Sequence, residues 1–263
     1  KLLQAIDEEF CIGFITFLNN ATTSNGKLLS GTTIYHYSRW LKDILQRAVV
    51  DELITRNPID KLIQNKEMPV RPDVQMDYLT IDEVKLLMQT PLRQTQIKQA
   101  FLFACFTGLR ISDILQLQWN NIKTDGNAIR FEIIMKKTGK PLAGKIPNAA
   151  KEWMPEQTDS PLVFSNIPTP TNIDVVIRRW IATSGISKHV TFHTARHTFA
   201  TLGLTLGTDL YTISKLLGHK YIAPRRYMPK SSTRRKTKQA IYLIMHSKIL
   251  ANKDDIIKVK NLT

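Results

Sequence analysis

The stretch from Thr191 to His219 constrains this chain more than any other, because its apolar spacing predicts two consecutive helices. Four apolar residues recur at spacings of four, three and four, as on one helix face: Ala195, Phe199, Leu202 and Leu206. The segment 207–209 (Gly-Thr-Asp) is typical of a helix end followed by an N-cap. We expect the second helix to end at Gly218 and to bury Leu210, Ile213, Leu216 and Leu217.

Polar residues of the same stretch fall away from the apolar stripe. His193 and Arg196 are three residues apart, so they share a helix face and can converge on one ligand. His219 directly follows the predicted helix end at Gly218. The sequence therefore predicts that two helices hold His193, Arg196 and His219 around one spot.

The charge of the chain indicates a polyanionic partner. Its formal net charge is +15. Its hydrophobic content of 43% is typical of a folded protein, and its 263 residues are enough for two domains. No apolar run approaches the roughly 20 residues that span a bilayer, so nucleic acid is favoured over a membrane. Cys11 and Cys105 lie in apolar runs, which favours buried, reduced thiols of a cytoplasmic protein.

The pattern predicts two domains, 1–73 and 79–263, joined by a linker at 66–78 that holds two prolines and no periodicity. Thr80 and Glu83 have the spacing of a capping box that opens the second domain. The first domain reads as all-helical, and its long helix has a predicted core stripe of Ile34, Tyr37, Leu41, Ile44, Leu45 and Ala48. A plain structural bundle and a DNA clamp remain alternative interpretations of this domain.

The second domain reads as mostly helical with one small antiparallel sheet between residues 122 and 147. Its first strand is predicted at Ala128–Ile134, followed by a hairpin turn at Lys137–Lys140 and a return strand at 143–146. Short helices are predicted at 151–154 and 171–181. A lysine at such a turn is ordinarily a solvated edge charge unless the hairpin covers a ligand.

A tight junction between two helices is predicted upstream of this sheet. An apolar helix ends at Thr107-Gly108, Arg110 follows, and Ser112-Asp113 starts a short helix that runs through Leu117. Arg110 is therefore oriented by backbone on both sides, and a structural salt bridge to Asp113 is the alternative to a binding role.

A basic segment follows His219. Residues 220–240 contain eight Lys or Arg, no acidic residue, and Tyr227. Such a run is often a solvated surface, but here it adjoins the polar residues of the predicted helices.

Together the polar candidates indicate a site for a phosphodiester, since the guanidinium of Arg can donate two parallel hydrogen bonds to phosphate oxygens. They are Arg110, Lys137, His193, Arg196, His219 and Tyr227. The sequence has no acidic cluster that would indicate a magnesium site and no Gly-rich loop that would indicate a nucleoside triphosphate. His193 and His197 are four apart, but they lack the third ligand of a zinc site. We therefore expect neither a metal nor a cofactor.

This set resembles the tyrosine recombinase family of phage integrases and Xer-type recombinases. The resemblance is carried by T-G-L-R-I-S-D-I at 107–114, K-K-T-G-K at 136–140, H-T-A-R-H-T-F-A-T at 193–201 and L-G-H at 217–219. It covers about residues 68–227 and is nearest to integrases of Bacteroides-type conjugative transposons. It implies a mainly α fold with a helical core-binding domain at 1–73, a catalytic domain with a small antiparallel sheet at 79–263, and a C-shaped clamp on double-stranded DNA.

The resemblance also implies a role for each candidate. Tyr227 is the nucleophile that forms a 3′-phosphotyrosyl link and releases a 5′-hydroxyl. Arg110 and Arg196 bind the non-bridging oxygens, and Lys137 protonates the leaving oxygen. His193 assists proton transfer at the tyrosine.

Two further positions carry roles by the same resemblance. His219 hydrogen-bonds the phosphate, and Asp113 orients the arginine. A family member works as a homo-oligomer, dimer to tetramer, through a Holliday junction in the bacterial cytoplasm at the nucleoid, with room for accessory DNA-bending factors. Integration and excision of a mobile element is the role that the resemblance favours.

Two other functions stay open at this point. Tyr227 lies eight residues after His219, where the family usually has nine, and Pro224 replaces part of the usual loop. This spacing favours a DNA-binding relative that no longer cleaves. A type IB topoisomerase shares the chemistry and differs in relaxing supercoils without paired sites.

Overall fold

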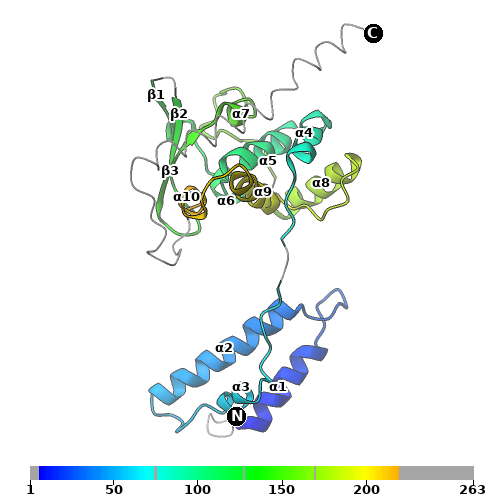
Figure 1. Ribbon diagram of the computed structural model, residues 1–263, viewed down its shortest axis with the longest axis vertical. Helices are drawn as coiled ribbons and strands as arrows, with labels where there is room; N and C mark the ends of the chain where they lie inside the picture. Colours follow the sequence, from blue (N-terminus) through cyan, green and yellow to red (C-terminus); the bar gives the residue numbers. More distant parts are fainter. Residues whose placement is uncertain (1–5, 74–75, 127, 169, 219–263) are drawn as a thin grey trace. The chain divides into compact units, whose positions relative to one another are not determined.

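A computed structural model describes residues 6–73, 76–126, 128–168 and 170–218 of the chain. The chain divides into two compact units, Lys1–Gln75 and Met76–Thr263, and the boundary falls inside the segment predicted as a linker. The predicted fold class is confirmed, since helices dominate both units and the second adds one small antiparallel sheet (Figure 1).

The N-terminal unit consists of the helices α1 (Glu8–Asn20), α2 (Gly31–Val50) and α3 (Ile59–Gln64). Asp7 caps α1 by accepting from the Phe10 amide, and Ser30 caps α2 by accepting from the Thr33 amide. The three helices close on a small apolar core of Cys11, Ile15, Leu45, Ile59 and Leu62.

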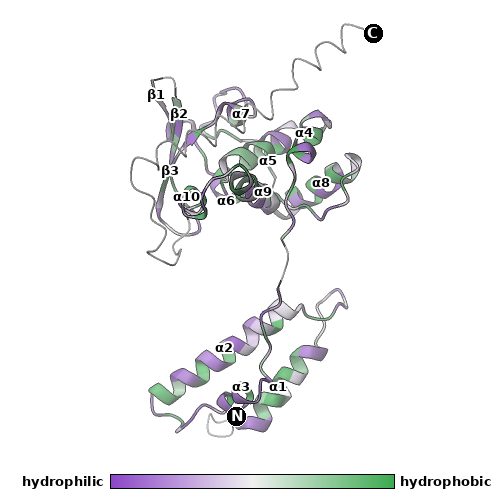
Figure 2. Cartoon of the chain, viewed as in Figure 1, coloured by the Kyte–Doolittle hydropathy of each residue, from purple (hydrophilic) through white to green (hydrophobic). Residues whose placement is uncertain are grey.

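The predicted core stripe of α2 is too wide. Ile34, Leu45 and Ala48 are buried as expected, but Tyr37 is 41% and Ile44 61% exposed. Among the described helices of this unit, α1 and α3 are those that share a core with α2, so its buried face is narrower than its apolar face. The exposed side of α2 therefore carries apolar residues as well as polar ones. Hydrophobic and hydrophilic segments alternate along this helix in Figure 2.

The C-terminal unit is built around α5 (Thr95–Thr107), whose residues from Ala100 to Thr107 are all buried. Helices α9 (Phe192–Thr205) and α7 (Asn148–Lys151) pack against α5. Figure 1 shows α5 and α9 in the middle of the unit, with the sheet on one side and two helices on the other. Those two helices are α4 (Ile81–Gln89) and α8 (Pro170–Thr183).

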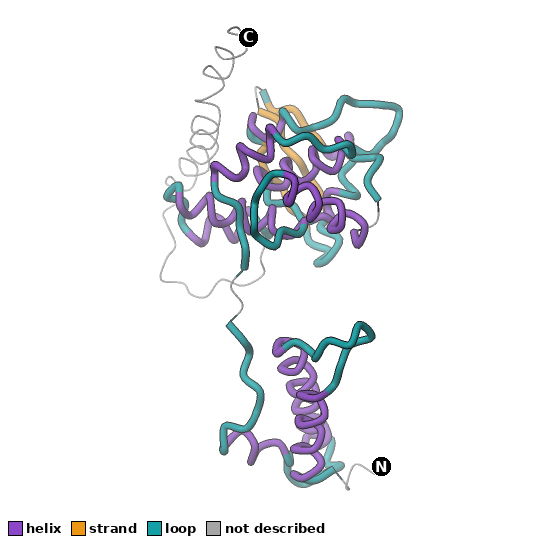
Figure 3. Tube along the Cα trace, turned by 90° about the vertical axis from the view of Figure 1, so that its right-hand side faces the viewer, coloured by secondary structure: helices purple, strands orange, loops and turns teal. Residues whose placement is uncertain are grey.

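The sheet has the order β1-β2-β3, with β1 at Ile122–Asp125, β2 at Ala128–Ile134 and β3 at Pro141–Ile146. Both pairs are antiparallel, and the strands lie behind the helices in the view of Figure 3. Phe131 pairs with Gly144, where a Cβ would lie 2.6 Å from the Phe131 ring. The hairpin predicted between residues 128 and 146 is therefore confirmed, with its turn at the expected lysines.

Local signals for helix ends were accurate. The capping box of Thr80 and Glu83 is present, and Asp209 caps α10 (Leu210–Leu216) by accepting from the Thr212 amide. Gly218 follows α10 with φ +65°, as a glycine that ends a helix does.

Three predictions about elements of this unit were wrong in detail. Helix α6 spans only Ile111–Ile114, and the chain then turns toward a 3-10 helix, η2 (Trp119–Asn121), instead of continuing to Leu117. Helix α7 begins at Asn148, three residues before the predicted start. Leu210 is 62% exposed, because it is the first residue of α10 and lies at the edge of the core that buries Ile213 and Leu216.

Both cysteines are buried and free, as expected. Burial is the main cause that raises the pKa of the Cys11 thiol to about 11, with Asp7 and Glu8 adding to it, and burial also raises the pKa of Cys105. Across the described residues no helix combines the length and apolar character needed to cross a membrane.

Gly108 offers a test of how tightly the second unit is packed. It has φ +72°, and a Cβ there would lie 2.6 Å from Phe199 Cδ1 and 2.8 Å from Leu217 Cδ2. We expect Gly108→Ala to lower the free energy of unfolding by about 2–4 kcal/mol, from left-handed backbone strain plus overpacking. Urea titration followed by circular dichroism measures the loss.

Gly139→Ala is the matched control, since Gly139 has φ +64° but open space around its Cα. It should lose only the backbone contribution of about 1 kcal/mol. Equal losses in the two variants would show that the contact with α9 and α10 does not matter.

Candidate functional site

The candidate site lies where the ends of three helices meet. Gly108 ends α5 in the left-handed conformation, and its amide donates to the carbonyl of Ala104. The absence of a side chain at Gly108 lets this helix end approach Phe199 of α9 and Leu217 at the end of α10. Arg110 comes two residues later and directly precedes α6 (Ile111–Ile114), so these helix ends surround one small region.

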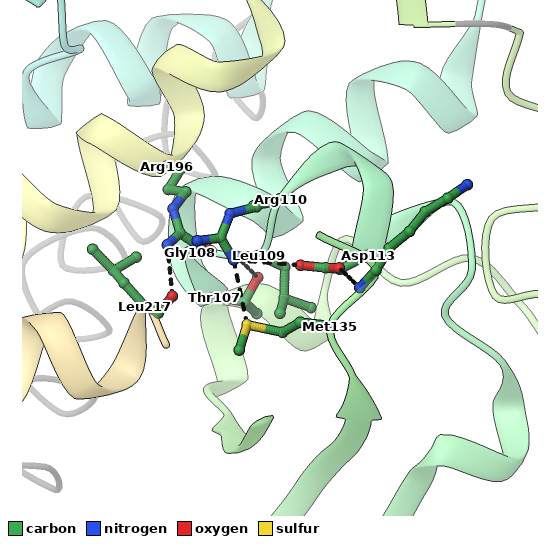
Figure 4. Close-up of polar contacts among 9 residues, drawn as sticks. Thr107, Gly108, Leu109, Arg110, Asp113, Met135, Arg196 and Leu217 are labelled. Carbon is green, nitrogen blue, oxygen red and sulfur yellow. Dashed lines mark hydrogen bonds and ion pairs between the residues drawn. The ribbon is translucent and has the colours of Figure 1, made fainter. Parts of the chain in front are cut away.

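Arg196 of α9 joins two of these helix ends. Its Nη1 donates to the Gly108 carbonyl at 2.8 Å, and its Nη2 donates to the Leu217 carbonyl at 2.6 Å (Figure 4). Carbonyls at helix C-termini lack helical partners and carry partial negative charge, which suits a cation. Arg196 is only 4% exposed. Burial, followed by the charge of Arg110, lowers its pKa to about 10, while Asp113 acts in the opposite direction.

Arg110 is held from the other side. Its Nη1 donates to Met135 Sδ at 3.3 Å and lies 3.9 Å from Asp113 Oδ2. Asp113 Oδ1 accepts from the Lys136 amide at 2.9 Å, which connects α6 to the base of the hairpin. The salt bridge considered as an alternative thus exists, but its length makes it a loose ion pair rather than a hydrogen bond.

The two guanidinium groups lie next to each other in Figure 4. Like charges so placed repel, and the lowered pKa of Arg196 reflects that repulsion together with burial. Within the described residues, Asp113 is the carboxylate that contacts Arg110. The arrangement therefore leaves excess positive charge that a bound anion would compensate.

His193 lies one helical turn before Arg196 on α9, beside the two arginines. Partial burial is the first cause that lowers its pKa, followed by the charges of His197, Arg196, Arg110 and Lys137. The smallest of these effects comes from Lys137, which is exposed on the hairpin turn. At neutral pH the ring is thus uncharged and can accept a proton.

His197 was considered only as a zinc ligand in the sequence. Its ring meets that of His193 edge to face, with centroids 4.7 Å apart, and its Nε2 is buried without a hydrogen-bond partner in the described part of the chain. In the same part, no group of three His, Cys, Asp or Glu residues is arranged to hold a metal ion.

Of the six predicted site residues, four lie in the described part of the chain and influence one another electrostatically: Arg110, Lys137, His193 and Arg196. His219 and Tyr227 lie outside the described residues, as does the basic segment 220–240. Their place in the site stays a prediction.

Sequence reasoning missed the groups that hold the two arginines. The Leu217 carbonyl could have been anticipated, because Gly218 signals a helix end with unpaired carbonyls. Met135 carries no such signal, since a methionine at a strand end is ordinarily read as core.

Arg196 should matter for folding as well as for any bound anion. We expect Arg196→Ala to lower the free energy of unfolding by at least about 2 kcal/mol, because two buried carbonyls lose their donors. Urea titration measures it, with Arg179→Ala on the exposed side of α8 as a control that changes less than about 0.5 kcal/mol. A loss in Arg196→Ala as small as in the control would contradict the structural role.

The two histidines should respond to pH in one direction. NMR titration of the ring protons should give midpoints below the ordinary value of 6.5 for both His193 and His197. The unfolded chain then binds protons more readily than the folded chain. The contribution of the two histidines to the free energy of unfolding should therefore be fully present above pH 6.5 and be lost as the pH falls below it. A midpoint above 6.5 for either residue would refute this, and the double variant His193→Gln/His197→Gln should flatten the pH dependence.

Comparison with known proteins agrees with this geometry. A profile described as the phage integrase family matches residues 77–232, and one described as a phage integrase SAM-like domain matches residues 2–66. The tyrosine recombinase XerC of Chlamydia caviae is 29% identical over 68% of this chain and 61% of its own length. The tyrosine recombinase XerD of Chlorobaculum tepidum is 27% identical over 66% of this chain and 62% of its own length. The chain thus spans about three fifths of these curated relatives.

Solved structures show the same fold at low identity. A lambda integrase (75–356) dimer bound to a COC′ core site has a TM-score of 0.60 and 20% identity, covering 87% of this chain and 85% of its own. The Tn1549 transposon integrase (82–397) in complex with circular intermediate DNA has a TM-score of 0.62 and 18% identity, covering 89% and 85%. A family profile that matches more than half of the residues, together with this fold and site, establishes that the chain belongs to the phage integrase family of tyrosine recombinases.

Proposed function

We propose that this chain is a site-specific DNA recombinase that cleaves and rejoins DNA through a 3′-phosphotyrosyl intermediate. The observation that carries the proposal is the pair of adjacent guanidiniums, Arg110 and Arg196, which have excess positive charge and rigid supports. A scissile phosphodiester has two non-bridging oxygens with shared negative charge, which such a pair fits.

Each predicted residue has one role in the proposed cleavage reaction. The Tyr227 hydroxyl attacks the phosphorus, a phosphotyrosyl bond forms, and the bond from phosphorus to the 5′-oxygen breaks. Arg110 and Arg196 stabilise the extra charge of the pentacoordinate transition state. His193, uncharged at neutral pH because its pKa is lowered, accepts the tyrosine proton.

The leaving group receives its proton from the other side. Lys137 on the hairpin turn protonates the 5′-oxygen, and His219 hydrogen-bonds the phosphate. The phosphotyrosyl ester conserves the energy of the broken bond, so a 5′-hydroxyl of a partner strand can reverse the attack and rejoin the DNA without ATP or metal.

The proposed partner is double-stranded DNA, which the net charge of +15 favours through phosphate contacts. Residues 1–73 form the clamp domain and residues 79–263 the catalytic domain. A lambda integrase dimer bound to a core site and a lambda integrase tetramer bound to a Holliday junction are among the similar structures, which supports a dimer-to-tetramer assembly. We place the activity at nucleoid DNA of a bacterial cytoplasm, in integration and excision of a mobile element, with accessory DNA-bending factors as optional partners.

Trapping the covalent intermediate tests the proposal. The chain is incubated in EDTA with duplexes that carry a randomised core and a nick, so that the strand released by cleavage diffuses away. DNA joined to protein after denaturation is recovered and sequenced, and the modified peptide is mapped. We expect an adduct on Tyr227 and a loss of at least about 10³-fold in Tyr227→Phe.

Tyr221→Phe and Tyr242→Phe are matched controls from the same part of the chain, and both should still form the adduct. An adduct on another tyrosine would identify that residue as the nucleophile and refute the role of Tyr227. Selective DNA binding without an adduct would favour the non-cleaving relative that the eight-residue spacing suggests. Relaxation of supercoils on a DNA with no second site would favour the topoisomerase.

A further inference from the structure

Met135 lies at the point where β2 passes into the hairpin turn. Its amide donates to the Lys140 carbonyl at 2.9 Å, and its carbonyl accepts from the Gly139 amide at 2.8 Å. These bonds close the turn that carries Lys137 two residues later. The backbone of Met135 therefore sets the base from which Lys137 extends.

The side chain of Met135 extends from the turn into the core, where it contacts Arg110 and the chain at Gly218. It is 2% exposed, and its Sδ accepts from Arg110 Nη1 at 3.3 Å. It also packs against Gly218, where a Cβ would lie 2.7 Å from the sulfur. Figure 4 shows Met135 directly beside the guanidinium of Arg110.

One residue thus contacts three segments that carry candidate site residues. These are the turn with Lys137, the junction with Arg110, and the end of α10, after which His219 follows in the sequence. A shift of Met135 would move these segments relative to one another.

The chemistry of the thioether suits this position. The side chain of Arg110 is only 15% exposed. A guanidinium N–H so far removed from water is costly without an acceptor, which gives a partner for Nη1 its value. A carboxylate at hydrogen-bond distance would satisfy the donor but would also neutralise the charge that a phosphate requires. A thioether is a weak and neutral acceptor, so it orients the guanidinium and leaves its charge available. The ion pair to Asp113, at 3.9 Å, is too long to hold that nitrogen by itself.

We propose that Met135 is a positioning residue for strand cleavage, whose thioether fixes the guanidinium of Arg110 and whose backbone fixes the turn of Lys137. The inference rests on the proposed recombinase function. It concerns a residue that acts through Arg110 and Lys137 and does not touch the DNA.

Two substitutions separate the acceptor from the packing. Met135→Leu keeps the apolar volume and removes the acceptor, whereas Met135→Gln keeps a long unbranched side chain and supplies an oxygen acceptor. The measurement is the single-turnover rate of adduct formation at saturating DNA, on a nicked duplex selected with the unaltered chain. We expect Met135→Leu to be about 10- to 100-fold slower with DNA affinity changed less than about threefold, and Met135→Gln to regain most of the rate.

Leu142→Met is the matched control, because Leu142 lines the same space beside Gly218 and no described hydrogen bond connects it to Arg110. Its cleavage rate should equal that of the unaltered chain. Urea titration of each variant shows whether it is folded at the assay temperature. Unchanged cleavage in Met135→Leu would overturn the proposal, as would equal slowing in Met135→Leu and Met135→Gln, which indicates packing alone.

A second measurement does not depend on cleavage. Side-chain ¹⁵N NMR of the free protein should show altered Arg110 resonances and faster exchange of its guanidinium protons in Met135→Leu, with Met135→Gln nearer the unaltered chain. Unchanged Arg110 resonances would overturn the role of Met135. If the unaltered chain forms no adduct while these resonances change as expected, the proposed function fails and the contact with Arg110 stands.

Discussion

The candidate site depends on the two hydrogen bonds that the buried guanidinium of Arg196 donates to the carbonyls of Gly108 and Leu217. Moving such a charge out of water is unfavourable unless each donor finds an acceptor, and here two donors find carbonyls that helix ends leave unpaired. The same two bonds hold the ends of α5 and α10 against α9. Fold and site therefore share one contact, since the residue that binds the phosphate in the proposed reaction also connects the helices that shape the site.

Close approach of backbone makes that contact geometrically feasible. Gly108 has no side chain to separate the end of α5 from Phe199 and Leu217, and Gly218 has none to separate the chain after α10 from Met135. Both glycines also have positive φ, so they serve as helix ends and as contact points at once. The hairpin is then connected to the arginines through Asp113 and Met135. Cations thus lie close together on supports that limit how far their repulsion can separate them.

Local signals predicted much of this structure, because they depend on a few neighbouring residues. The capping box of Thr80 and Glu83, the cap at Asp209 and the hairpin turn after Met135 were all anticipated in place. Burial was predicted less well where it depends on what covers a helix. Tyr37 and Ile44 belong to an apolar stripe by spacing, yet no helix in the described part of their unit covers them. Leu210 is the first residue of α10 and lies at the edge of the core.

Periodicity, caps and motif spacing depend on neighbouring residues, so the sequence predicted α9, the junction before α6 and the hairpin turn, which carry the described candidate residues. It also indicated the family, through short motifs that the profile match confirms. The groups that hold the arginines are apparent in the folded chain alone: the carbonyls of Gly108 and Leu217, the thioether of Met135 and the loose ion pair with Asp113. Carbonyls occur at every residue, and a methionine fits many cores, so their contacts are set by how distant segments pack and not by any local pattern.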